Sequence, residues 1–326
     1  MIRSKSLSSS VKCLLILGLA FGYGCEKTAQ QGGKSPKTVF NVAVLLPLSG
    51  DGASYGEKER DGILLAIEQA NEAGNIPDIE LRPSVEDTAG KGTTAASALQ
   101  KILSKGDTFV GIGDAFSTPT LTMVPIAERH KFLLISPSAS SPELSGTSKY
   151  FFRVWPSDTA EGEQIAVAAL EKLHLRTFAI FHVNNDYGAG LAKIFRETVE
   201  KRDGKILLVD AFAEGQTNFR TTLTRIKGLA PQAVYVPGYY KELVQLLRQA
   251  SELAVKTQFL SCATFYEPEV PKLAGAAAEG VVFVEPSFDR KSDRAAAQQF
   301  VRDYEARFKT EAGTYAAHGY DAAGVL

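Results

Sequence analysis

Apolar and polar positions are arranged in alternating blocks along most of the chain. From residue 40 onward, short apolar runs are separated by longer stretches in which apolar residues recur every three or four positions. The short runs are rich in β-branched residues and lack strict alternation, a pattern typical of strands buried on both faces of a parallel sheet. They predict strands at 42–47, 79–85, 109–113, 132–136, 178–183, 206–211, 233–237, 259–263 and 281–284.

The stretches between these strands have helical periodicity. Ile63, Ile67 and Ala70 follow helical spacing before Gly74, a residue that favours helix termination. Two stretches in the second half have the same spacing: Leu191, Ile194, Phe195 and Val199, then Leu243, Leu246, Leu247 and Ala250. Repeated strand–helix–strand units predict parallel sheets with right-handed crossovers. The fold class is therefore α/β.

The repeat is interrupted between Ser136 and Ala160, where the chain is rich in Ser and Pro and holds one strand-like run, 150–155. We interpret 155–158 as a first crossing between two lobes and 285–287 as a second. The stretch from 40 to 326 is also longer than one compact core normally holds. We therefore predict two doubly wound parallel-sheet lobes with a hinge, the first from 40–157 and 287–326 and the second from 158–286.

The first 25 residues have the pattern of an export signal. Arg3 and Lys5 precede an apolar run, 11–23, which is shorter than the roughly 20 apolar residues that a membrane span needs. Gly24 then precedes Cys25, as in bacterial lipoprotein signals, where the thiol receives lipid. An ordinary signal peptide is the alternative, because Gly22 stands where such signals usually carry Leu. Residues 26–39 are polar and predict a flexible tether.

This signal predicts a periplasmic protein that is held at a membrane by a lipid anchor only. Glu26 after the cysteine resembles the sorting pattern for the outer membrane. Of the three cysteines, Cys13 lies in the signal and Cys25 would carry lipid, so Cys262 alone remains and is expected to be a small buried side chain. The formal net charge of −1 argues against a general attraction to nucleic acid.

Several predicted strands end in small hydroxyl residues, Gly and Tyr. Ser117 lies at a predicted helix start near Thr120, where its hydroxyl and the backbone N–H groups at the positive end of the helix dipole favour a carboxylate. Each cluster alone has a structural alternative, because Ser and Thr are ordinary helix caps and tyrosines pack at strand ends. The clusters nevertheless share the carboxyl ends of strands, which predicts a ligand site between the lobes. They are 47–56, 113–119, 136–141, 183–188 and 237–240.

Blocks of sequence in these regions resemble the leucine/isoleucine/valine-binding type of periplasmic solute-binding protein, which serves bacterial ABC importers. The blocks are VAVLLPLSGDGASYG (42–56), ISPSASSPEL (135–144), NNDYGAGLA (184–192), VYVPGYYKELVQLLRQA (234–250) and EGVVF (279–283). They cover the chain from about residue 40 in family order. The resemblance implies the type I periplasmic-binding-protein architecture. It also implies capture of a small ligand, such as an amino acid or a related carboxylate or amide, for ABC transporter membrane subunits.

The resemblance also implies roles for individual residues. The carboxylate of the ligand would bind the Ser117 hydroxyl and backbone amides around Ser117 and Ser140, and its ammonium would bind the Ser138 carbonyl and the Ser140 hydroxyl. Tyr55, Tyr187 and Tyr239 would form walls, with Ala115 and Phe116 at the floor. The full set of predicted ligand-binding residues is Tyr55, Ala115, Phe116, Ser117, Ser138, Ala139, Ser140, Tyr187, Tyr239 and Ala263.

The chain departs from the family pattern at Ala263, where the family places an acid that binds the ammonium. Asp114 or Glu267 is expected to substitute, or the ligand lacks an ammonium, so the sequence does not name the ligand. No arginine or lysine lies in the strand-end clusters, and Lys58 and Arg60 are expected to face solvent. A second departure is the stop at Leu326 within a helical pattern, which we interpret as a truncated C-terminus.

The sequence favours a binding protein over an enzyme. None of the four histidines has a second ligand at metal spacing, and GxSxG, HExxH and Walker motifs are absent from the sequence. We expect no catalytic residue, no metal and no cofactor. The alternative function is a sensor domain of the same fold that reports a ligand to a receptor rather than to a transporter.

Overall fold

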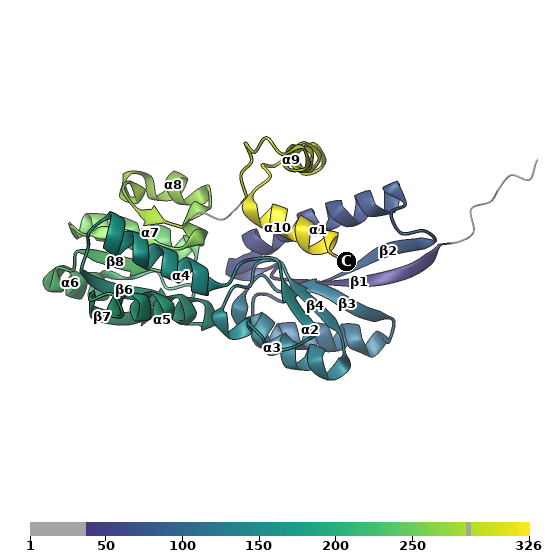
Figure 1. Cartoon of the computed structure of the whole chain (residues 1–326), viewed down its shortest axis with the longest axis horizontal. Helices are drawn as coiled ribbons and strands as arrows, with labels where there is room; N and C mark the ends of the chain where they lie inside the picture. Colours follow the sequence, from purple (N-terminus) through teal and green to yellow (C-terminus); the bar gives the residue numbers. More distant parts are fainter. Residues whose placement is uncertain (1–36, 285–287) are drawn as a thin grey trace, which may run out of the picture. The chain divides into compact units, whose positions relative to one another are not determined.

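The computed structural model describes residues 37–284 and 288–326. Within them, ten strands form two parallel sheets of five strands each, with helices on both sides (Figure 1). The order in the first sheet is β2-β1-β3-β4-β5, and in the second it is β10-β9-β8-β6-β7. This arrangement confirms the predicted α/β class with two parallel-sheet lobes.

Each predicted strand is present, with small shifts at its ends. The first sheet contains β1 (Thr38–Leu46), β2 (Ile79–Asp87), β3 (Thr108–Gly113), β4 (Leu133–Ser136) and β5 (Phe151–Arg153). The second contains β6 (Thr177–Val183), β7 (Lys205–Phe212), β8 (Ala233–Val236), β9 (Gln258–Ser261) and β10 (Val282–Phe283).

Helices connect the strands and cover both sheets. The first lobe holds α1 (Ala53–Ala73), α2 (Gly92–Lys105), α3 (Ser117–His130), α9 (Ala295–Phe308) and α10 (Thr314–Gly324). The second lobe holds α4 (Asp158–Val167), α5 (Asp186–Glu200), α6 (Arg220–Leu229), α7 (Tyr240–Glu252) and α8 (Glu269–Ala274). Helix α1 ends at Gly74, whose φ of 65° is the left-handed conformation that glycine adopts without a Cβ clash.

Strand β1 shows how the first sheet is buried on both faces. Ala43 and Leu45 pack into a core with residues of α2 and α3, whereas Val42, Val44 and Leu46 pack into a core with residues of α1 and α10. All five side chains are fully buried. Burial of a Val or Leu side chain is worth about 1.5–3 kcal/mol, so both helical layers are held to the sheet by this one strand.

The second sheet is held by a core rich in aromatic residues. Phe181 on β6 packs edge to face on Phe212 of β7, with ring centroids 5.1 Å apart, and Phe195 of α5 stacks on Tyr235 of β8 at 4.3 Å. Such pairs add about 0.5–1.5 kcal/mol to the burial of their surface. Cys262 lies in the same core and is fully buried, as predicted.

The structure corrects two boundaries. The predicted tether, 26–39, overlaps the start of β1, because the strand begins at Thr38 and pairs with Ile79 of β2. Helix α3 begins at Ser117 rather than near Thr120. The signal, Cys25 and the second proposed crossing at 285–287 lie outside the described residues. In the described part of the chain, no helix is long and apolar enough to cross a membrane.

Candidate functional site

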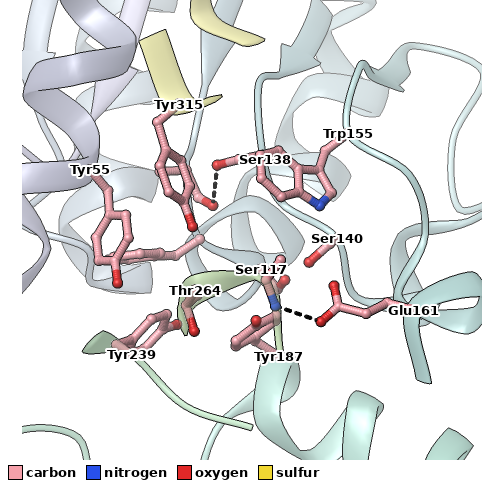
Figure 2. A pocket seen from close by; sticks show the side chains of 13 residues that line it. Tyr55, Ser117, Ser138, Ser140, Trp155, Glu161, Tyr187, Tyr239, Thr264 and Tyr315 are labelled. Carbon is pink, nitrogen blue, oxygen red and sulfur yellow. Dashed lines mark hydrogen bonds between the residues drawn. The ribbon is translucent and has the colours of Figure 1, made fainter. Parts of the chain in front are cut away.

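A cavity of about 380 Å³, including the part that opens towards solvent, lies between side chains of the two lobes (Figure 2). The lining residues come from segments far apart in the sequence. They are Tyr55, Ala115, Phe116, Ser117, Ser138, Ser140, Trp155, Glu161, Tyr187, Tyr239, Ala263, Thr264 and Tyr315.

The structure brings nine of the ten predicted ligand-binding residues to this cavity. They are Tyr55, Ala115, Phe116, Ser117, Ser138, Ser140, Tyr187, Tyr239 and Ala263. Ala139 is the exception: it is 1% exposed, packs in the core of the first lobe and does not line the cavity. Its neighbours Ser138 and Ser140 face the cavity because alternate residues of an extended segment point to opposite sides.

Ser117 is placed by the transition from β3 to α3. It is the first residue of the helix, follows Phe116 at the N-cap and is 2% exposed. Its hydroxyl oxygen accepts a hydrogen bond from the Ser141 backbone N–H at 3.1 Å. A serine hydroxyl can donate one hydrogen bond while it accepts others, so the proton of Ser117 remains available for a ligand.

The loop after β4 carries the other two serines. The Ser138 hydroxyl donates to the Glu59 carboxylate and lies 3.0 Å from the Ala115 carbonyl, so it is engaged within the first lobe. The Ser140 carbonyl accepts a hydrogen bond at 2.9 Å from the backbone N–H of Asp158, the first residue of α4. This bond fixes the loop against the start of the second lobe.

The second lobe contributes a tyrosine pair and a short helical turn. Tyr187 of α5 stacks on Tyr239, with ring centroids 5.6 Å apart and planes 16° apart, and the Asn185 amide donates to the Tyr239 hydroxyl at 3.1 Å. Ala263 and Thr264 begin a 3₁₀ turn that follows β9, Ala263–Tyr266. The carboxyl ends of β6, β8 and β9 therefore supply this wall.

Aromatic rings enclose the remainder of the cavity. Tyr55 of α1 is in edge contact with Phe116 at 5.7 Å and with Tyr315 of α10 at 4.8 Å. Trp155 stacks on Tyr315 at 5.4 Å, with an interplanar angle of 20°. Tyr55 and Trp155 belong to the same buried cluster as the second-lobe core, so this wall is continuous across the two lobes.

Sequence reasoning missed four of the lining residues. The sequence places Trp155 only in the crossing between lobes, and Thr264 directly follows the predicted Ala263. Tyr315 reaches the cavity from α10, which is distant in sequence from every predicted cluster. Glu161 lies in the first turn of α4. Acidic residues are common there because they interact favourably with the positive end of the helix dipole, so the presence of Glu161 does not by itself indicate a ligand site.

Two acidic side chains lie close together at the start of α4. Glu161 is 8% exposed and Asp158 is 1% exposed. Burial raises the pKa of both carboxyl groups, and their mutual repulsion raises the pKa of Asp158 further, against the opposing effects of the Ser140 hydroxyl and Arg153. The Glu161 carboxylate accepts a hydrogen bond from the backbone N–H of Ala263 at 2.8 Å, which favours its ionised form.

Neither acid that the sequence offered as a substitute at Ala263 lines the cavity. Asp114 is fully buried, is bound to the Thr88 hydroxyl and accepts from the Phe116 backbone N–H at 2.9 Å. Glu267 is bound to Lys58. The expected solvent position of Lys58 is therefore wrong: its side chain is 28% exposed and joins α1 to the second lobe. Arg60 pairs with its neighbour Asp61 at 2.8 Å and is also partly buried.

Two further polar contacts join the lobes around the cavity. The Thr118 hydroxyl donates to the Asp186 carboxylate at 2.6 Å, which links the start of α3 to the start of α5. Lys241 of α7 forms an ion pair with Asp51 at 2.9 Å. Together with Lys58 and Glu267, these contacts hold the two lobes against each other. Among the described residues, no group of three or more His, Cys, Asp or Glu side chains is placed to bind a metal ion.

Comparison with known proteins agrees with this architecture. Residues 39–326 match the family model described as periplasmic binding protein. The Leucine-, isoleucine-, valine-, threonine-, and alanine-binding protein of Pseudomonas aeruginosa is 28% identical over 289 residues, which cover 88% of this chain and 76% of the relative. The Leu/Ile/Val-binding protein of Escherichia coli is 31% identical over 248 residues, which cover 76% of this chain and 67% of the relative.

Solved structures share the fold. The branched-chain amino acid transporter substrate binding protein of Streptococcus pneumoniae, in complex with isoleucine, has a TM-score of 0.80 at 28% identity over 88% of this chain and 82% of that one. A solute binding protein of an ABC transporter from Rhodopseudomonas palustris, in complex with benzoate, has a TM-score of 0.80 at 21% identity over 89% and 79%. The predicted type I architecture is thus confirmed. Because the family model spans almost all of the described residues, we conclude that this chain belongs to the periplasmic binding protein family and is similar to its Leu/Ile/Val-binding members.

Proposed function

We propose that this protein is a periplasmic solute-binding protein that captures a small carboxylate ligand, an amino acid or a related acid or amide, for an ABC importer. The observation that carries the proposal is the cavity itself. It is lined by hydroxyl and aromatic side chains from both lobes. A binding protein needs such a site to hold a solute, and the relatives named above carry names of binding proteins.

Neutral donors would hold the carboxylate in this site. Ser117 retains a free hydroxyl proton, and the backbone N–H groups of Ser117 and Thr118 at the start of α3 have no partner within the helix. No lysine or arginine is among the lining residues. Recognition would therefore depend on hydrogen-bond direction and would respond weakly to salt.

Closure of the two lobes would complete the site. Tyr187 and Tyr239 approach from the second lobe, and Tyr55 and Ser117 from the first, so separation of the lobes would open the cavity. The chain connects the lobes at 155–158, and a hinge there fits the domain closure by which ligands are enclosed. The lobe contacts of Thr118, Lys58 and Lys241 would then form on closure.

The sequence supports attachment to a membrane through lipid on Cys25. Export and lipidation would keep the protein near importer subunits while leaving both lobes free to move. The polar residues that follow Cys25 suit a tether between anchor and domain.

Thermal-shift measurements test the proposed function. A compound that binds only the folded protein raises the melting temperature by mass action. We expect stabilisation by at least one compound in a panel of amino acids, aliphatic carboxylates, amides and aromatic acids, followed by a 1:1 stoichiometry in calorimetry. If no member of this panel stabilises the protein or binds in calorimetry, the proposed function is wrong.

A further inference from the structure

The cavity is lined by the carboxylate of Glu161, a residue to which the family resemblance assigns no role. The residue expected to bind an ammonium group is Ala263, which has no charge. Glu161 approaches the same position from α4, and its carboxylate is hydrogen-bonded to the backbone N–H of Ala263 at 2.8 Å. In Figure 2 the carboxylate of Glu161 points towards the interior of the cavity. An acid is thus present beside residue 263, although it belongs to another element.

Only part of the hydrogen-bonding capacity of Glu161 is used within the protein. Its oxygen Oε1 accepts from Ala263, and no hydrogen bond joins Oε2 to any residue of 37–284 or 288–326. Over the same residues, Glu161 has no ion pair with a lysine, arginine or histidine. Arg153 is engaged elsewhere: its guanidinium donates to the Ser141 carbonyl at 2.8 Å. The carboxylate lines the cavity without a cation beside it.

A buried carboxylate without a cation is unfavourable in its charged form. Burial accordingly raises the pKa of Glu161 to about 7, against the lowering effect of the Ala263 N–H. The titratable groups around it offer no positive charge at short range. They are Asp158 on the same helix, Tyr187 on α5, Tyr235 on β8 and Cys262 after β9, with Arg153 beyond Asp158. A ligand that supplied a cation would remove this penalty.

The same cavity also provides hydrogen-bond donors. Ser117 and the first turn of α3 favour a negative group, whereas Glu161 favours a positive one. The rings of Tyr55, Trp155 and Tyr315 line the remainder of the cavity. A small zwitterion satisfies Ser117 and Glu161 at once, whereas a plain carboxylate leaves Glu161 unpaired.

We infer that Glu161 is the ammonium-binding residue of this site and that it selects α-amino acids over carboxylic acids without an amino group. This inference rests on the proposed function, because it concerns the same cavity. Glu161 lies on a different element from Ala263 and takes the place of the acid that is missing there. Its Oε1 also holds the backbone at Ala263 by accepting the hydrogen bond from the Ala263 N–H. The selectivity of the site is then encoded on α4 rather than on the turn after β9.

Calorimetry with matched compound pairs tests the inference. The pairs are L-alanine and propanoate, L-valine and 3-methylbutanoate, L-leucine and 4-methylpentanoate, and L-phenylalanine and 3-phenylpropanoate, which differ only in the amino group. We expect the wild-type protein to bind at least one amino acid about 10- to 100-fold more tightly than its partner acid, the range of a charge-assisted hydrogen bond. E161Q keeps an acceptor for Ala263 and should lose this preference without a loss for the partner acid.

Two further variants separate a binding role from a structural one. The double variant E161Q, A263E returns a carboxylate to the cavity from the turn after β9. It should restore the tighter binding of the amino acid relative to its partner acid. E163Q, on the exposed face of the same helix, should leave every affinity unchanged. Amino-acid binding at pH 7 should also release protons from Glu161, measured as a dependence of the binding enthalpy on buffer ionisation, and E161Q should abolish that release.

The outcomes are distinct for the inference and for the proposed function. Equal or tighter binding of the partner acids by the wild type overturns the inference, as does an unchanged preference in E161Q. In either case, binding of a carboxylate or an amide by the protein would still support the proposed function. If neither these pairs nor the wider panel of amides and aromatic acids binds, both conclusions fall.

Discussion

The hydroxyl oxygen of Tyr55 accepts a hydrogen bond from the backbone N–H of Tyr240 at 3.1 Å. Tyr55 lies on α1 in the first lobe and lines the cavity, and Tyr240 opens α7 in the second, so this bond joins the two lobes. The bond also satisfies an N–H at a helix start, which has no partner within the helix. Tyr55 thus both lines the cavity and joins the two lobes.

Replacement of this hydroxyl should weaken ligand binding. We expect Tyr55→Phe to reduce affinity about 2- to 10-fold, because a lost hydrogen bond is worth about 0.5–1.5 kcal/mol and this one joins the two lobes. Calorimetry with the ligand found by thermal shift measures the change. Tyr320→Phe is the matched control, since the Tyr320 hydroxyl bonds Gln69 within the first lobe at 2.6 Å. Equal effects of the two variants would contradict a role for Tyr55 in closure.

The Ser117 hydroxyl should contribute more than any other single neutral donor. Ser117→Ala removes a donor to a charged group and should weaken carboxylate binding about 10- to 100-fold, equivalent to about 1.5–3 kcal/mol. Ser97→Ala serves as the control, because the Ser97 hydroxyl is exposed and bonds only the Thr93 carbonyl on α2. Unchanged affinity in Ser117→Ala would mean that the carboxylate binds elsewhere.

The ion pair between Lys58 and Glu267 should stabilise the closed arrangement. Lys58→Met leaves Glu267, whose side chain is 6% exposed, without its cation, so the lobes should separate more often. We expect a loss of affinity of about 2- to 20-fold and a larger radius of gyration without ligand in small-angle scattering. The double variant Lys58→Met, Glu267→Gln should recover part of both effects.

A pair of similar type within one lobe provides the control. Lys101 binds Glu86 at 2.8 Å, and both residues belong to the first lobe. Lys101→Met should leave affinity and scattering unchanged. If Lys58→Met also leaves both unchanged, the contact between α1 and the second lobe does not influence closure.

Asp114 should make the folded protein less stable as the pH rises. Burial raises its pKa from 3.8 to about 7, so between these values the folded state binds more protons than the unfolded state. The free energy of unfolding therefore decreases as the pH rises through this window. The difference between a pKa of 3.8 and one of about 7 sets an upper limit of about 4 kcal/mol for this contribution.

Urea unfolding between pH 4.5 and 7.5 measures this dependence. Asp114→Asn should reduce the dependence of the unfolding free energy on pH, and the asparagine retains an acceptor for the Phe116 N–H. Part of the dependence should remain in this variant, because burial also raises the pKa of Glu59. Glu86→Gln, in the exposed pair with Lys101, is the control and should keep the wild-type slope. A slope in Asp114→Asn equal to that of the wild type would show that this carboxyl does not remain protonated in the folded protein.

The lipid anchor can be tested on the full-length protein in cells. Cys25→Ser should shift the mature protein from the membrane fraction to the soluble periplasmic fraction, because the thiol that would receive lipid is missing. Metabolic labelling with a fatty-acid analogue provides a second measurement. Retention of Cys25→Ser in the membrane fraction would contradict lipidation at this residue.

Most of the fold was predictable because strands and helices that are buried in the core have recognisable patterns of apolar residues in the sequence. Strand β1 is apolar on both faces, and its run of Val, Ala and Leu predicted a central strand before any partner was known. Gly74 likewise marked the end of α1. The boundaries were less predictable, as at Thr38, because pairing with β2 extends the strand into residues that are polar or exposed.

The site was predictable where it is built from strand ends. Ser117, Ser140, Tyr187 and Tyr239 lie near the carboxyl ends of parallel strands, which meet at one edge of each sheet. Glu161 and Tyr315 were missed because they reach the cavity from helices. The face that a helix presents to a distant segment depends on tertiary packing, and neither residue differs locally from ordinary helical positions.

Trp155 gives the binding cavity a spectroscopic property of its own. It is the only tryptophan of the chain, and it lines the cavity beside Tyr315 and His318, with ring centroids 5.4 Å and 4.4 Å away. Emission excited at the red edge of indole absorption therefore originates at this cavity and nowhere else in the protein. Under the proposed function this emission reports occupancy, so that titrations can be followed without a dye, a label or an engineered fluorophore.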